Sequence, residues 1–464
     1  MERIYKGAPQ FRERGSDMAK PVTGPADIVI VNATILPMGG GATIENGMLK
    51  ISGDSITELG PANSFDVSTG KRRIDAKGAV VMPGFVNCHT HIASNMLLRG
   101  LLEDVQLFEW LSTMWKLKRN FDEETLYWAG LMGLVEMARS GITCFNEHFD
   151  AYRVEPQIEA LKKVPLRATL GYGFADRGLY APTAGWSWEA LDGFSDRVKL
   201  HHRSGNGRIH LALSPHAPYS CGADMFRRVR EVADAEKIAI HTHLAEGPQE
   251  VRYVAETYGS TPVRWVHSLG FLGPDVTAAH CTQLEDDDIR IMAETGTKIG
   301  HCPCCNAKLN SGTLRLRAVR EAGITVGLAT DGPASHNSLD MFQEMKFAGM
   351  IHKDKTNDVE FLKTGELLEL ATCEAAKAMN RPETGMLAPG SKADVIIVDL
   401  DKPHCLPVYH PAAALVYSAR AEDVVTTIVD GKIIMENRTL PGIDEAEIRV
   451  KFRERAFSLR DRSL

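Results

Sequence analysis

The sequence predicts an α/β protein built on a (β/α)₈ TIM-type barrel, with a small β-sandwich domain built from both termini. Eight short apolar runs alternate with helical patterning through the middle of the chain. Alternating hairpin-like segments occupy both ends, and histidine or acidic side chains follow several of the apolar runs. A chain of 464 residues is long enough for one large barrel and a satellite domain.

The central runs are expected to be parallel strands, because near-continuous apolar strands fit a sheet that is buried on both faces. The expected strands are Val80–His91, Gly141–Phe149, Arg167–Phe174, Ile209–His216, Ile238–Glu246, Val276–Cys281, Lys298–Cys302 and Thr325–Asp331. Helical patterning lies between them, as in Glu123–Ser140, Asp224–Glu236 and Leu314–Ala322. A closed barrel accounts for eight such repeats, and an open doubly wound sheet is the structural alternative.

The two ends of the chain alternate apolar and polar residues and carry Asp-Gly and Gly-Asp turns, a pattern typical of β-hairpins. We expect residues 27–82 and 385–440 to pair into the small β-sandwich, and residues 83–384 to form the barrel. Residues 1–26 are expected to be an N-terminal arm and residues 441–464 a C-terminal helix.

Charge and cysteine usage restrict the class of partner. Lys and Arg number 53 against 60 Asp and Glu, so the net charge of −7 disfavours nucleic acid and anionic membranes as partners. No run approaches the roughly 20 apolar residues of a membrane helix. We expect no secretory signal, because the N-terminal segment has scattered charge and no apolar stretch. The nine dispersed cysteines indicate reduced thiols, so a cytoplasmic location is expected.

The first barrel strand ends in GFVNCHTH, which places two histidines two residues apart. Side chains at this spacing share one face of a strand, so His89 and His91 project together into the barrel mouth. Two imidazoles on one face can form half of a divalent-metal site. The motif alone is a weak signal, because polar residues often end a strand without binding metal.

Further polar residues end other predicted strands. His241 and His243 share a face in IAIHTHLAE, and Glu246 follows them. The remaining strand-end residues are His216 in SPHAPYSC, His280 in AAHC and Asp331 in LATDG. Histidine, Glu or Asp thus ends five of the eight predicted strands, which packing alone explains poorly. The C-terminal rim of a barrel is where its active site lies.

At this point the chain resembles the amidohydrolase superfamily, in the branch of methylthioadenosine/S-adenosylhomocysteine deaminases and s-triazine hydrolases. The similarity runs from about residue 27 to 440 and rests on PGFVNCHTH, LLRGLLED, SPHAPYSC, HTHLAE, AAHC, a partial HCPCCNAKL, TDGPASHNSLDMFQEMK and ADVIIVDLD. The resemblance implies a hydrolase that removes an exocyclic amino group from a nitrogen heterocycle, and a homo-oligomer, either a dimer or a tetramer.

The resemblance also implies the roles of individual residues. His89, His91, His243 and Asp331 match the ligands of one divalent metal ion, with Zn²⁺ favoured and Fe²⁺, Mn²⁺ or Ni²⁺ also compatible with these donors. Such an ion lowers the pKa of a bound water toward about 7. Glu246 matches the general acid/base, and His280 and Asp331 match residues that orient the nucleophile.

Expected substrate contacts are His216, Trp110, Arg119, His301 and His336. Nucleoside deaminases of this branch hold the ribose hydroxyls with a glutamate at a place that falls at or near Arg119 here. This departure favours a free base, such as an aminopyrimidine, aminopurine or aminotriazine, over an adenosine-type nucleoside. Cys302 and Cys305 replace the usual Asn and Ser, and HCPCC is interpreted as pocket wall rather than as a second metal site.

Two other functions stay open at this stage. A triazine dechlorinase would use the same metal and water with a different leaving group, although His216 favours deamination. A non-catalytic relative would use the barrel as an interaction scaffold, but such a protein should have lost metal ligands, and His89, His91, His243 and Asp331 are all present.

Overall fold

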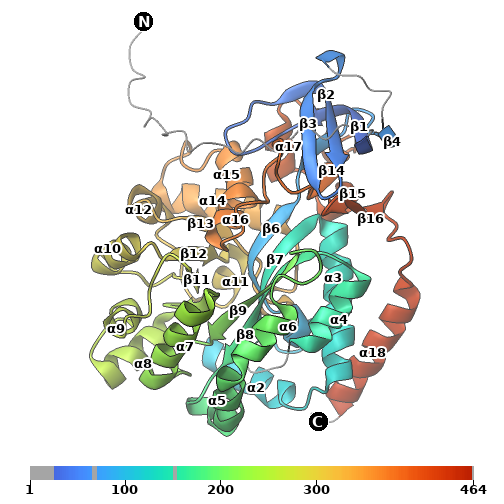
Figure 1. Ribbon diagram of the computed structural model, residues 1–464. Coiled ribbons are helices and arrows are strands. Elements are labelled where there is room, and N and C mark those ends of the chain that lie inside the picture. Colours follow the sequence, from blue (N-terminus) through green and yellow to red (C-terminus); the bar gives the residue numbers. More distant parts are fainter. Residues whose placement is uncertain (1–25, 65–69, 150–153, 462–464) are drawn as a thin grey trace, which may run out of the picture.

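The computed structural model describes residues 26–64, 70–149 and 154–461, so the arm expected at 1–26 lies almost wholly outside the described residues. Eight parallel strands form one sheet in sequence order and curve into the barrel (Figure 1). They are β6 (Phe85–Thr90), β7 (Ile142–Phe149), β8 (Arg167–Phe174), β9 (Ile209–Pro215), β10 (Ala239–Leu244), β11 (Val276–His280), β12 (Lys298–His301) and β13 (Val326–Leu328). The predicted barrel is confirmed.

The first and last barrel strands meet just beyond their ends. The Asp331 backbone N–H donates to the His89 carbonyl at 3.0 Å, and the Thr330 N–H donates to the Asn87 side chain at 3.0 Å. The Asn87 amide also donates to the Thr330 hydroxyl at 2.7 Å. These bonds bring residues from opposite ends of the sheet to one point, so the barrel closure itself places Asp331 beside His89.

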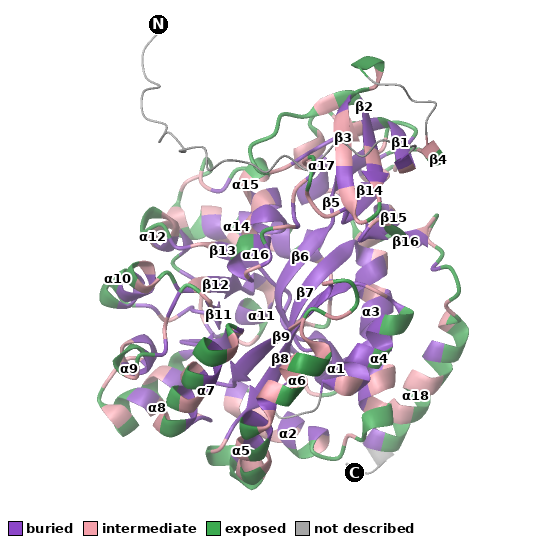
Figure 2. Cartoon of the chain, in the orientation of Figure 1, coloured by how far each residue is buried: buried purple, intermediate pink, exposed green. Residues whose placement is uncertain are grey.

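Helices surround the barrel and bury its strands, so the strands are almost entirely purple in Figure 2. The α-helices are α1 (Ile92–Asn95), α2 (Leu107–Lys118), α3 (Glu123–Ser140), α4 (Glu155–Lys163), α5 (Ala184–Asp192), α6 (Phe194–His201), α7 (Ala223–Glu236), α8 (Pro248–Tyr258), α9 (Pro262–Ser268), α10 (Asp286–Thr295), α11 (Pro303–Lys308), α12 (Leu316–Glu321), α13 (Pro333–His336), α14 (Met341–Thr356), α15 (Thr364–Leu370), α16 (Cys373–Ala378), α17 (Pro411–Tyr417) and α18 (Glu445–Asp461). None of the helices in the described part of the chain is long and apolar enough to cross a membrane.

Helix α3 shows how local sequence sets these boundaries. The Asp122 side chain accepts a hydrogen bond from the Thr125 N–H at 2.8 Å and caps the helix start. Gly141 ends the helix with a φ of 84°, a left-handed conformation that glycine adopts without strain. Strand β7 begins at the next residue, as the repeat of helix and strand requires.

The second sheet joins the two ends of the chain. Its strands are β1 (Ala26–Ile35), β2 (Ile44–Ser52), β3 (Ser55–Pro61), β4 (Gly70–Asp75), β5 (Val80–Pro83), β14 (Val395–Val398), β15 (Val424–Val429) and β16 (Lys432–Glu436). Strand β5 pairs in parallel with β1 and antiparallel with β14, which connects the N-terminal and C-terminal pieces. The small β-domain drawn from both ends is therefore confirmed, and its hydrogen-bonded strands form one continuous, branched sheet.

The expected strand Val80–His91 is wrong as a single element. It divides at Pro83 and Gly84 into β5, which belongs to the small sheet, and β6, which belongs to the barrel. A Cβ atom at Gly84 would lie 2.1 Å from Thr143 Cγ2, so the chain passes from one sheet to the other where only glycine fits.

A buried ion cluster attaches the small sheet to the barrel at the end opposite the rim. Arg167, the first residue of β8, donates to both Asp394 oxygens at 2.6 and 3.0 Å and to Asp430 at 3.0 Å. All three side chains are buried, so their charges have lost their hydration and depend on one another. Burial raises the pKa of Asp394, but Arg167 outweighs burial, and the pKa lies below the usual 3.8.

We predict that Asp394→Asn lowers the free energy of unfolding by about 3–5 kcal/mol, because it leaves the Arg167 charge buried without its main partner. Denaturant unfolding at neutral pH measures the loss. Asp196→Asn is the matched control, because the Asp196–Lys199 pair is exposed and its removal should change stability little. An equal effect of the two substitutions would contradict the assigned importance of the buried cluster.

The same variant carries a pH signature. The pKa of Asp394 is lower in the folded protein than the usual 3.8, so its stabilisation is complete above that value and is lost as the pH falls through the folded pKa. The stability difference between the wild type and Asp394→Asn should therefore shrink below pH 3.8. A difference that grows with acidity contradicts the account.

Candidate functional site

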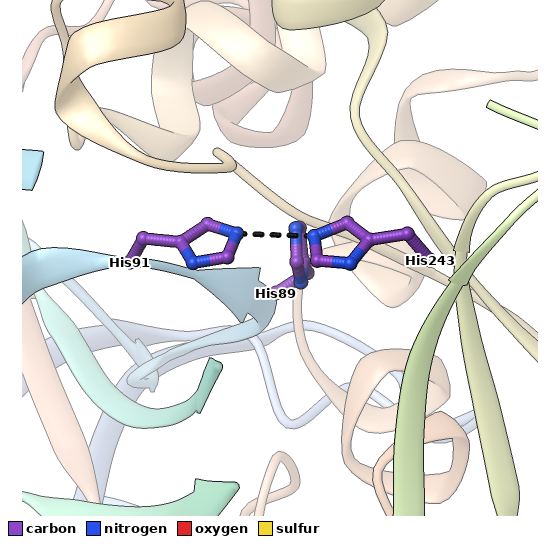
Figure 3. A group of neighbouring side chains, drawn as sticks. All are labelled: His89, His91 and His243. Carbon is purple, nitrogen blue, oxygen red and sulfur yellow. Dashed lines mark hydrogen bonds between the residues drawn. The ribbon is translucent and has the colours of Figure 1, made fainter. Parts of the chain in front are cut away.

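All four predicted ligand side chains meet at the C-terminal rim of the barrel. His89 lies on β6, His91 directly follows it, His243 lies on β10 and Asp331 follows β13. Figure 3 shows the His91 and His243 rings pointing at each other, with His89 between them. Asp331 Oδ1 lies 3.3 Å from His89 Nε2 and 3.5 Å from His91 Nε2. Residues 242 positions apart in the sequence thus share one centre.

Backbone carbonyls fix the protonation of two of these rings. His91 Nδ1 lies 2.8 Å from the His148 carbonyl, and His243 Nδ1 lies 2.7 Å from the His216 carbonyl. A carbonyl only accepts, so each Nδ1 carries the hydrogen and each Nε2 keeps a lone pair. Yet the two Nε2 atoms lie 3.1 Å apart. Two lone pairs at this separation repel unless a cation lies between or beside them, so the donors fit a metal ion.

His241 holds the ring of His89, the third imidazole of the predicted ligand set. Its Nε2 lies 2.9 Å from His89 Nδ1, which turns His89 Nε2 toward Asp331. His89 is fully buried, and its Nε2 has no hydrogen-bond partner in the described part of the chain. Histidines that bind metal usually have their second nitrogen held in this manner. His241 is therefore a positioning residue in this geometry rather than part of the central group.

Asp331 is held on both sides. The Gly332 N–H donates to Oδ1 at 2.5 Å, and the Cys305 thiol donates to Oδ2 at 2.8 Å. Burial raises the pKa of Asp331, but His89, His91 and His280 outweigh burial, so the pKa lies well below the usual 3.8. The group is a carboxylate at neutral pH and adds the negative charge that a divalent cation requires.

Glu246 and His280 lie beside this centre. Burial, then Asp331 and Glu250, raise the pKa of Glu246 well above the usual 4.5. His280 Nε2 lies 3.8 Å from Glu246 Oε1, and burial lowers the pKa of His280 to about 3. The Asn306 amide lies 2.9 Å from His280 Nδ1, so if it donates there, His280 Nε2 carries the hydrogen and faces Glu246. The pair can therefore exchange protons with a bound molecule.

A pocket opens over these groups, and two of the expected substrate contacts line it. Trp110 extends from α2, and His216 follows β9, where it contacts Ser220 at 2.8 Å and the Tyr180 hydroxyl at 3.3 Å. The pocket is lined by His91, Asn95, Leu107, Trp110, Leu111, Lys118, Tyr180, His216, Tyr219, His243, Glu246, His280, Leu309 and Asp331. Its floor is polar, and its wall from α2 is apolar and aromatic.

Three expected substrate contacts lie elsewhere. Arg119 is exposed at the end of α2, because the helix turns its neighbour Lys118 inward instead. His301 is buried behind the pocket and contacts His352, with 2.8 Å between their Nε2 atoms. His336 lies on α13, and its Nε2 is 2.9 Å from Glu344 Oε1. The structure therefore corrects the expected contacts at these three positions.

Five residues have roles that were not expected from the sequence. Lys118, Tyr180 and Tyr219 line the pocket, and Cys305 and Asn306 contact Asp331 and His280. The helical period offered a signal for Lys118, because it follows Leu111 by seven residues and Trp110 by eight, and such spacings share one face of a helix. Cys305 was noted only as pocket wall, and its bond to Asp331 depends on how α11 packs.

The family of this chain follows from its similarity to known proteins. Residues 80–434 match the sequence model of the Amidohydrolase family. The chain belongs to the amidohydrolase family. Two relatives share its length: a 5-methylthioadenosine/S-adenosylhomocysteine deaminase of Pelotomaculum thermopropionicum is 38% identical over 440 residues, covering 94% of this chain and 100% of the relative. A 5'-deoxyadenosine deaminase of Methanosarcina mazei is 39% identical over 431 residues, covering 91% and 96%.

Two solved structures of similar proteins have the same fold. An adenosine deaminase from Xanthomonas campestris with bound zinc superposes with a TM-score of 0.87 at 29% identity, covering 94% of this chain and 99% of that one. The atrazine chlorohydrolase TrzN from Arthrobacter aurescens has a TM-score of 0.85 at 23% identity, and the match covers 92% of this chain and 100% of that one. At this identity the match supports the fold and not the function. The family and its deaminase members support a hydrolase that acts on C–N bonds.

We predict that Cys305→Ala weakens metal binding about 10–100-fold, because the Asp331 carboxylate loses the donor that fixes its second oxygen. Cys305→Ser should restore most of the affinity, since a hydroxyl also donates. Competition with a chelator measures both values. Equal affinities of the alanine variant and the wild type would show that Asp331 does not depend on this thiol.

Proposed function

We propose that this amidohydrolase is a metal-dependent deaminase of adenosine-type nucleosides, which replaces the exocyclic amino group of a 6-aminopurine by a carbonyl oxygen and releases ammonia. The observation that carries the proposal is the set of His89, His91, His243 and Asp331 around one point, with Glu246 beside it. The relatives named above, which deaminate such nucleosides by name, support the substrate class.

We propose His89, His91, His243 and Asp331 as ligands of one divalent cation, with Zn²⁺ as the favoured ion. Three imidazoles and one carboxylate are a donor set that zinc accepts, and the opposed Nε2 atoms of His91 and His243 fit a shared cation. When bound, a divalent ion supplies a nucleophile at neutral pH by acidifying water.

The remaining chemistry belongs to side chains of this chain. Glu246 donates a proton to the ring nitrogen next to the carbon under attack, because addition to the neutral ring places negative charge on that nitrogen. Its raised pKa fits a carboxyl group that can be protonated when the substrate arrives. The Glu246 carboxylate then takes the proton of the newly added hydroxyl group and transfers it to the departing amino group, so that ammonia leaves as the carbonyl forms. His280 and Asp331 orient the incoming oxygen.

We infer a nucleoside rather than the free base expected from the sequence, because the relatives are nucleoside deaminases by name. Leu107, Trp110 and Leu111 on α2 form an apolar wall beside the polar groups of the pocket. Such a wall can cover a substituent on the ring, and Lys118 can donate a hydrogen bond to it. Arg119, the residue expected near the place of the ribose-binding carboxylate, is exposed and does not enter the pocket, where Lys118 lies instead.

The cysteines fit the proposed compartment. All nine are free thiols, and eight of them are buried. We propose a cytoplasmic location, where such thiols stay reduced.

We predict that Glu246→Gln retains the fold and the metal but lowers kcat about 10²–10⁴-fold, because an amide cannot transfer the proton. Ammonia release measures turnover, and elemental analysis of the same preparation measures metal content. Loss of metal in step with activity would instead make Glu246 a structural residue, and unchanged turnover would refute its assigned role.

A substrate screen separates the candidate functions. Adenosine, 5'-deoxyadenosine, methylthioadenosine and S-adenosylhomocysteine should give higher kcat/KM for ammonia release than adenine, aminopyrimidines or aminotriazines. A chlorinated triazine, with chloride release as the readout, tests the dechlorinase alternative. A free base that exceeds every nucleoside would overturn the proposed substrate class.

A further inference from the structure

A second group of metal-binding side chains lies behind the barrel rim, outside the pocket. Cys304 on α11, His336 on α13 and Glu344 on α14 each offer one ligand atom, and these atoms lie within 4.8 Å of one another. Helix α11 packs against both other helices. The three residues come from three helices, so their convergence depends on the fold and not on local sequence.

In the described part of the chain, three polar atoms of this group lack the hydrogen-bond partners that buried groups normally have, whereas the Cys304 thiol lies 3.9 Å from the Gln343 carbonyl oxygen. Glu344 is fully buried, and only 5% of the His336 side chain is exposed. Neither His336 nitrogen nor Glu344 Oε1 makes a hydrogen bond within the described residues, although His336 Nε2 and Glu344 Oε1 lie 2.9 Å apart. The two atoms approach each other without hydrogen-bond geometry. Atoms in this arrangement can be satisfied together by one cation that both face.

The other Glu344 oxygen fixes the group to α11. Oε2 accepts a hydrogen bond from the Cys304 N–H at 3.2 Å, which leaves Oε1 directed at His336. Cys304 is the one cysteine of nine that is only partly buried, so an ion can reach its thiol from solvent. The carboxylate is therefore held by one oxygen and available through the other.

We propose that Cys304, His336 and Glu344 form a second divalent-metal site with the donor chemistry of zinc. Thiolate, imidazole and carboxylate are the three ligand types that zinc takes from proteins, and water completes a tetrahedral set. The Cys304 thiol releases its proton to solvent when the ion binds. His336 and Cys304 act here as metal ligands, rather than as the substrate contact and pocket wall expected from the sequence.

An ion at this site would link helices α11 and α13, which hold or follow residues of the first centre. Helix α11 carries Cys305, which holds Asp331, and Asn306, which contacts His280. Helix α13 begins at Pro333, two residues after Asp331. The second site therefore stabilises the elements that position the reacting groups, while no ligand is shared between the two centres.

A cluster elsewhere in the chain provides a matched control. His404, Cys405 and Asp423 also lie within 4.8 Å of one another. There, however, Asp423 Oδ2 lies 2.8 Å from His404 Nε2 in hydrogen-bond geometry and accepts the Arg420 N–H at 2.8 Å. The same residue types thus satisfy one another without an ion, so substitution of Cys405 should leave metal content unchanged.

Loading the full-length protein with Co²⁺ or Zn²⁺ and counting bound ions by elemental analysis tests the proposal. We expect two equivalents in the wild type, one in Cys304→Ser and in His336→Asn, and two in Cys405→Ala. The Co²⁺ protein should show a sulfur-to-metal charge-transfer band that is absent in Cys304→Ser, because the four ligands proposed for the first centre include no thiolate. Circular dichroism checks that each variant is folded.

Each other outcome overturns the proposal. A single equivalent in the wild type, without a charge-transfer band, means that His336 and Glu344 form an ion pair only. A band that survives in Cys304→Ser assigns the sulfur to Cys302 or Cys305 beside the first centre. Loss of an ion in Cys405→Ala moves the second site to the control cluster. The readouts do not depend on turnover, so they stand whether or not the proposed substrate is right.

Discussion

The opposed imidazole nitrogens of His91 and His243 are the constraint on which the rest of the site depends. Each ring donates through Nδ1 to a backbone carbonyl, so two lone pairs face each other at 3.1 Å in a buried place. Without a cation this arrangement is unfavourable, because buried acceptors without donors lose their hydration and gain nothing in return. The protein maintains the arrangement through its backbone, which is why the barrel must close accurately at this rim.

The two ends of the barrel contain different kinds of polar contact. At the rim, hydrogen bonds between β6 and the residues after β13 place Asp331 next to His89. At the other end, Arg167 joins β8 to the small sheet through two buried aspartates. The charged groups at that end satisfy one another, whereas the opposed imidazoles at the rim require a bound ion as their partner. Such a separation lets the rim retain strained or unsatisfied groups while the whole chain stays folded.

Much of this could be predicted from the sequence, because apolar runs and strand-end residues are local signals. Strand β8 and helix α3 have the predicted bounds, and the side chains at the ends of β6, β10 and β13 meet as expected. Other features depend on tertiary packing. Arg119 is exposed although Lys118, the residue before it, lines the pocket, because consecutive residues of a helix point in different directions. His301 contacts His352 behind the pocket. The division of Val80–His91 falls at the Pro83–Gly84 dipeptide, which is a local turn signal, whereas the close contact of Gly84 with Thr143 depends on tertiary packing.

The preference for a free base was drawn from the apparent absence of one carboxylate, and the relatives favour nucleosides instead. The lesson is physical: specificity resides in which atoms face the cavity, and a residue type near the right sequence position says little until its direction is known.

Anomalous X-ray diffraction at the zinc absorption edge, from crystals of the zinc-loaded protein, shows whether the four side chains bind one ion. We expect a peak about 2.0–2.2 Å from the Nε2 atoms of His89, His91 and His243 and from a carboxylate oxygen of Asp331. Zinc-loaded crystals with no anomalous peak among these four side chains would contradict the proposed metal site.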